Sequence, residues 1–192
     1  MTREEALQLL DSYVDNKNLK NHMLAVEAAC RFYAVKFGAA AIGEPRSISM
    51  EREEKWGTAG LLHDADWEKH PDKHPQVIID DLRKRGVDEE IIHAISCHGN
   101  NFGLERKSQL DHVLFACDEI TGMITATALV RPTKLEGLEV KSVKKKMKDK
   151  DFAAGVNRAD VVQGAEELGI SLEEHIQNVI TAMQEVKGDL GL

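Results

Sequence analysis

The sequence predicts an all-α fold, and three observations support this class. Apolar residues recur every three or four positions in one segment after another, as they do along one face of a helix. Capping signals stand at the starts of these segments, for example Thr2 with Glu5, and glycine or proline often follows their ends. No stretch shows the apolar and polar alternation of a β-strand. The 192 residues are enough for one domain that buries its core without disulfides.

The expected helices follow from these signals in chain order. The first runs from Thr2 to near Asn16, and the second begins around Asn18 and carries His22 on its apolar stripe. Residues 38–49, with two glycines and a proline, are predicted to form a loop. Further helices are expected over 51–62, from His74-Pro75 to Gly86, from Asp88 to Cys97, from Ser108 or Asp111 to Val130, over 140–147, and from caps at Asn157 and Ser171. Residues 188–192 are expected to fray.

Composition narrows the classes of partner. The formal net charge of −8 argues against binding of a nucleic-acid polymer, which requires excess positive charge. No segment reaches the roughly 18 apolar residues of a membrane span, and no signal region is visible, so we expect a soluble cytoplasmic protein without a membrane partner. Cys30, Cys97 and Cys117 are widely spaced, which predicts buried free thiols in a reducing compartment. The oligomeric state is left open.

Six polar residues lie on or beside predicted apolar faces. The central pair follows an apolar run, Leu61-Leu62-His63-Asp64, and the full set is His22, His63, Asp64, His74, His98 and Asp118. Burying an ionised carboxylate without a partner is costly, and a buried imidazole needs partners for both ring nitrogens. A bound divalent cation would compensate all of these groups together.

The order of four of these residues resembles the HD superfamily of metal-dependent phosphohydrolases. A histidine, an adjacent His-Asp pair and a distant aspartate define that family, and His22, His63-Asp64 and Asp118 match them in order. The stretch from residues 19–23 through 130–132 is also similar to uncharacterised bacterial HD-domain hydrolases. The resemblance implies an HD-domain helical bundle as a single domain over 1–192, with a core over about 19–130 and a C-terminal helical extension over about 134–187.

Two further histidines resemble the two-metal branch of the superfamily. This branch includes diadenosine-tetraphosphate hydrolases and di-iron oxygenases, and its two additional histidines correspond to His74 and His98. The resemblance implies one ion on His22, His63, Asp64 and Asp118, and a second on His74, His98 and Asp64, with Asp64 as the bridge. One or two divalent ions are therefore expected. Imidazole and carboxylate ligands favour iron or manganese, and nickel, zinc, cobalt and magnesium stay open.

The resemblance implies hydrolysis of a small phosphorylated substrate, such as a nucleotide, through a metal-activated water, with Asp64 as the catalytic carboxylate. Arg131, Lys134 and Lys145 are predicted to bind the phosphate, although the run that contains Lys145 equally fits a solvated helix face. Trp67 and Phe102 are expected in loops beside the site, where they could stack on a base.

Two other functions stay open at this point. The same six ligands serve di-iron oxygenases that cleave a C–C or C–P bond, and a catalytically silent module could use the pocket to sense a nucleotide. The branch of cyclic-di-GMP phosphodiesterases is disfavoured because Ala65-Asp66-Trp67 follows the His-Asp pair in place of Ile-Gly-Lys. His70, His93 and His175 are interpreted as surface residues or as residues behind the ligands.

Overall fold

A computed structural model describes residues 1–39 and 46–192 of the chain. Within these residues every regular element is a helix, which confirms the predicted all-α class. The α-helices are α1 (Arg3–Tyr13), α2 (Lys17–Ala39), α3 (Arg46–Leu62), α4 (Gln76–Lys84), α5 (Glu89–Ser96), α6 (Gln109–Leu129), α7 (Val140–Met147), α8 (Arg158–Glu167), α9 (Leu172–Glu185) and α10 (Lys187–Leu190), with 3₁₀ helices η1 (Pro71–Lys73) and η2 (Asn100–Phe102) between them.

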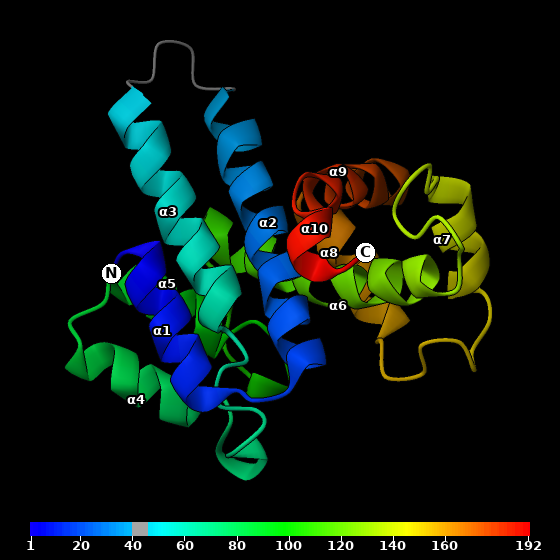
Figure 1. The fold of residues 1–192 in the computed structure, drawn as a ribbon. Coiled ribbons are helices and arrows are strands. Elements are labelled where there is room, and N and C mark those ends of the chain that lie inside the picture. Colours follow the sequence, from blue (N-terminus) through cyan, green and yellow to red (C-terminus); the bar gives the residue numbers. More distant parts are fainter. Residues whose placement is uncertain (40–45) are drawn as a thin grey trace.

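Helices α2 and α3 run antiparallel and form the most extensive helix pair of the fold (Figure 1). Their close approach depends on Gly60, because a Cβ atom at this position would lie 2.9 Å from the Val26 carbonyl oxygen and 2.9 Å from the Glu27 Cα. The end of α3 carries the His-Asp pair, so this contact fixes the pair against α2.

Helix α6 packs against α2 and α5. Helices α8 and α9, from the C-terminal part of the chain, also pack against it (Figure 1). A capping box begins it, in which the Ser108 hydroxyl accepts a hydrogen bond from the Asp111 amide and the Asp111 carboxylate accepts one from the Ser108 amide. Gly164 of α8 permits close contact, because a Cβ there would lie 2.6 Å from the Ala116 Cα. The C-terminal helices are thus packed directly on the helix that contains Asp118.

Most of the buried apolar residues form one cluster that extends from Ala6 in α1 to Leu190 in α10. Cys30, Cys97 and Cys117 are all buried and free, as predicted. Among the helices of the described ranges, none is long and apolar enough to cross a bilayer.

Two predicted boundaries were wrong. Gly38 lies inside α2 and residues 46–49 lie inside α3, so the predicted loop over 38–49 is helical at both ends, and its residues 40–45 fall outside the described part of the chain. Packing of α2 along α3 outweighs the helix-weakening effect of a glycine. The last residues do not fray, because Leu190 is 3 % exposed and its carbonyl oxygen accepts a hydrogen bond from the Asn21 side chain.

His175 was interpreted as a surface residue or as a residue behind the ligands, and the structure buries it completely on α9. Its Nδ1 lies 2.6 Å from the Tyr33 hydroxyl, and its Nε2 lies 2.8 Å from the Ala116 carbonyl oxygen. Because a carbonyl oxygen can only accept, Nε2 carries the proton and Nδ1 accepts from Tyr33. The polar neighbours Glu173 and Glu174 conceal in the sequence that His175 lies on the inner face of α9.

Acid is expected to destabilise the fold through His175. Burial lowers the pKa of His175 from 6.5 to about 4, so the ring is neutral in the folded protein at neutral pH. The unfolded chain takes up a proton first as the pH falls, and the stabilising contribution is complete above pH 6.5 and lost progressively down to pH 4. At 1.36 kcal/mol per pH unit this interval amounts to about 3 kcal/mol.

Urea unfolding at several pH values should show a shallower pH dependence of the unfolding free energy for His175→Gln, whereas His70→Gln, at an exposed position, should keep the native dependence. An unchanged slope in His175→Gln would contradict the assignment.

Candidate metal centre

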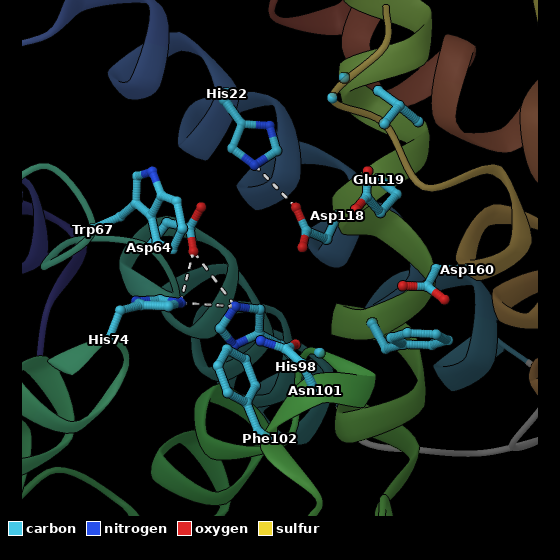
Figure 2. Close-up of a pocket in the computed structure, with 15 residues that line it drawn as sticks. His22, Asp64, Trp67, His74, His98, Asn101, Phe102, Asp118, Glu119 and Asp160 are labelled. Carbon is cyan, nitrogen blue, oxygen red and sulfur yellow. Dashed lines mark hydrogen bonds and ion pairs between the residues drawn. The ribbon is translucent and has the colours of Figure 1, made fainter. Parts of the chain in front are cut away.

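The structure brings the six predicted ligands together from separate parts of the chain. His22 lies in α2, His63 and Asp64 follow α3, and Asp118 lies in α6. His74 stands between η1 and α4, and His98 follows α5. Figure 2 shows His22, Asp64, His74, His98 and Asp118 turned toward one another across a common space.

The first group of ligand atoms contains His22, His63 and Asp118. His22 Nε2 lies 3.0 Å from Asp118 Oδ1, and His63 Nε2 lies 3.5 Å from the same oxygen. One atom from each residue can be chosen so that all three lie within 4.8 Å of one another. This spacing suits three ligands around one cation.

The second group contains Asp64, His74 and His98. Asp64 Oδ1 lies 3.3 Å from His74 Nε2 and 3.4 Å from His98 Nε2. The other carboxylate oxygen, Oδ2, lies 3.7 Å from His63 Nε2 in the first group. The Asp64 carboxylate therefore lies between the two groups, where one oxygen faces each.

The hydrogen bonds behind the histidines set their tautomers. His63 Nδ1 lies 2.8 Å from the Gly60 carbonyl oxygen, and His98 Nδ1 lies 2.6 Å from the Ile95 carbonyl oxygen. These oxygens accept only, so each Nδ1 carries a proton, and in the neutral ring that binds a metal each Nε2 presents its lone pair to the centre. His74 follows the same pattern through a carboxylate, and its Nε2 lies 3.3 Å from that of His98. At this distance both Nε2 atoms can bind the same cation.

Asp66 orients His74 and was not identified from the sequence. Its side chain is fully buried, with Oδ1 2.6 Å from His74 Nδ1 and Oδ2 accepting a hydrogen bond of 2.9 Å from the Ile78 amide. The second carboxylate of the segment His63-Asp64-Ala65-Asp66 was the available signal. Such carboxylates fix the ring orientation of a metal-binding histidine and raise its basicity.

The electrostatics of the centre favour positive charge. Burial alone would lower the pKa of His63, but the carboxylates of Asp64 and Asp118 outweigh it and raise that pKa to about 10. Burial likewise opposes ionisation of Asp64 and of Asp118, yet the neighbouring histidines hold the pKa of each carboxyl well below its usual value. The residues thus stabilise a cation at the point where the ligand atoms converge.

The residues present fit a divalent metal. His63 Nε2 is buried and has no hydrogen-bond partner, which is costly for a polar atom unless a cation completes its environment. The donor set of imidazole nitrogens and carboxylate oxygens suits iron, manganese, zinc and related ions. His63 and Asp64 would hold the metal together with the four other ligands.

A cavity of about 400 Å³ opens beside the ligands. The sequence-predicted Trp67 and Phe102 both line it, and their rings lie against His74 and His98 at centroid distances of 5.2 and 4.9 Å. The remaining residues of its wall include Glu119, Gly155, Val156 and Asp160, and no lysine or arginine is among the described residues that line it. The Glu119 carboxylate accepts a hydrogen bond of 3.0 Å from the Asn157 amide, which ties the C-terminal extension to α6.

The structure does not bring the predicted phosphate-binding cations to this cavity. Arg131 donates to the carbonyl oxygens of Lys134 and Gly137 in its own turn, and Lys134 donates to Gly191. Lys145 is exposed on α7. The reason is distance along α6: the 11 residues from Asp118 to Leu129 span about 16 Å at 1.5 Å per residue, so the turn that follows is remote from the ligands.

Of the other histidines, His70 is exposed as expected, and His93 is half-exposed and lies 2.9 Å from the Asp111 carboxylate. Neither belongs to the groups described above.

Comparison with known proteins gives one family. Residues 19–123 match the family model of the HD domain, which covers more than half of the chain and contains all six ligands. No curated protein and no solved structure matches the chain. The chain belongs to the HD domain family.

Proposed function

We propose that the protein is a metal-dependent phosphohydrolase that acts on a nucleotide or another small phosphoester. The observation that carries the proposal is the convergence of histidine Nε2 atoms on the Asp64 carboxylate, with each supporting Nδ1 held by a group behind it. Membership of the HD domain family supports it. The size of the cavity supports a small molecule over a polymer, because about 400 Å³ lies in the usual range of small-molecule sites.

Two divalent ions, when bound, supply Lewis acidity for the phosphoryl group and lower the pKa of a water molecule. The residues of the chain supply position. Asp64 would bridge the two ligand groups, and His22, His63 and Asp118 would hold one side while His74 and His98 hold the other. Trp67 and Phe102 would exclude bulk water from one side and provide flat surfaces for a planar part of the substrate.

A second candidate is a di-iron oxygenase, and one observation favours it. No lysine or arginine is among the described lining residues, while Glu119 and Asp160 add negative charge. A polyphosphate would find few positive partners there besides the metals, whereas a polyol or a phosphonate bearing an amino group would find hydrogen-bond acceptors.

The proposal is tested with protein purified without chelator. Its metal content is measured, and phosphate release from a panel of nucleotides and small phosphoesters is followed with iron, manganese, zinc, nickel, cobalt or magnesium. We expect release that depends on the metal and stops on chelation. Oxygen uptake with the iron-loaded protein and no phosphate release would support the oxygenase. Tight nucleotide binding without either reaction would support the silent sensing module.

A further inference from the structure

A third set of metal-ligand types lies apart from the six residues described above. It consists of His93 and Cys97 on and just after α5, and Asp111 in the first turn of α6. One ligand atom from each can be chosen so that all lie within 4.8 Å of one another, and the set shares no residue with the other two.

The separations match those of zinc ligands. His93 Nδ1 lies 3.8 Å from Cys97 Sγ and 2.9 Å from Asp111 Oδ2. Around a tetrahedral zinc, with bonds of about 2.3 Å to sulfur and about 2.1 Å to nitrogen or oxygen, neighbouring ligand atoms lie roughly 3.4–3.6 Å apart. The two separations from His93 Nδ1 thus lie within about 0.5 Å of these values, and the three ligand atoms lie within 4.8 Å of one another.

The role of Asp111 as a helix cap accounts for only one of its two carboxylate oxygens. Oδ2 accepts hydrogen bonds from the amides of Lys107 and Ser108, which completes the cap, and it also lies 2.9 Å from His93 Nδ1. Oδ1 is buried within a fully buried side chain and has no hydrogen-bond partner. A buried carboxylate oxygen without a partner is rare and costly, and a cation is the partner that a carboxylate accepts most strongly.

Charge and access also fit a zinc ion. A thiolate from Cys97 and the carboxylate of Asp111 would neutralise the two charges of the cation, so the buried site would carry no net charge. The thiol proton would pass to solvent when the metal binds. His93 is 38 % exposed, so its ring offers a route for the ion, and its Nε2 can carry the proton and bond to water while Nδ1 binds the metal.

We propose that His93, Cys97 and Asp111 form a separate zinc site that ties the end of α5 to the start of α6, with water in the fourth position. The mixed nitrogen, sulfur and oxygen donors select zinc over the harder cations. Because α5 leads directly into His98, zinc bound here would fix the segment that supplies one ligand of the HD centre.

Cobalt is the probe, since a bond from thiolate to cobalt gives a near-ultraviolet charge-transfer band that imidazole and carboxylate ligands do not give. The full-length wild-type chain loaded with cobalt should show this band. Cys97→Ala should abolish it and bind one equivalent of zinc fewer than the wild type, and His93→Gln should weaken zinc binding there at least about tenfold. Cys30→Ala is the matched control, because Cys30 is equally buried and lies outside the site, and it should keep the band.

A second measurement needs no variant. X-ray absorption at the zinc edge of the wild-type chain should show sulfur in the coordination sphere, which the HD centre cannot supply because none of its six ligands is a cysteine. Absence of the cobalt band, or a zinc spectrum with nitrogen and oxygen ligands alone, would overturn the proposal. Either result is independent of phosphate release, so this proposal and the proposed function can fail separately.

Discussion

Replacement of Asp64 by Asn is expected to reduce metal-dependent phosphate release at least about 10³-fold, which corresponds to roughly 4 kcal/mol of transition-state stabilisation. The Asp64 carboxylate faces both ligand groups, through Oδ1 toward His74 and His98 and through Oδ2 toward His63. An amide would carry no negative charge and would turn only one oxygen toward the two ligand groups, so metal binding at both groups would weaken together. The measurement is kcat for the substrate identified from the panel, with metal content determined on the same sample.

Asp15→Asn is the control with the same chemical change. The Asp15 side chain is 78 % exposed and pairs with Lys69 at the surface, so the activity of the Asp15→Asn variant should match that of the wild type. Retention of activity and of full metal content in Asp64→Asn would contradict the bridging role.

Replacement of Asp66 by Asn is expected to weaken binding of one metal by about 10- to 100-fold, the usual effect of losing the group that orients a ligand histidine. Asp66 accepts from both His74 and the Ile78 amide. An asparagine side chain offers only one oxygen, so its amino group must face one of these donors. The loss should concern the ion on Asp64, His74 and His98, and much less the ion on His22, His63 and Asp118.

Calorimetric titration of the metal-free protein with manganese measures this difference as a change in one of two binding steps. Asp72→Asn, an exposed carboxylate in the same connection, should leave both steps unchanged. Equal weakening of both steps in Asp66→Asn would indicate general destabilisation and contradict the specific role.

Local signals in the sequence predicted most of the helices because each depends on its own residues. The caps at Thr2, Ser108, Asn157 and Ser171 all form in the structure. Boundaries set by packing were missed, as at Gly38 inside α2 and at Leu190 in α10. These depend on contacts with distant segments, which single-sequence patterns do not contain.

The clustering of the six candidate ligands could be predicted because their residue types and their places on apolar helix faces point to the same chemistry. Asp66 was missed because its partner, His74, lies eight residues away and only the fold brings the two together. Arg131 was misplaced for the opposite reason. It follows Asp118 closely in the sequence, but the length of α6 separates it from the candidate ligands. Its guanidinium group donates instead to the Gly137 carbonyl oxygen in the turn after α6.

The wall formed by Gly155, Val156 and Asp160 is separate in sequence from the ligands. All six ligands lie within residues 19–123, whereas this wall comes from the chain beyond the segment that matches the family. Substitutions in the later segment can therefore reshape this wall of the cavity without replacing any of the six candidate ligands.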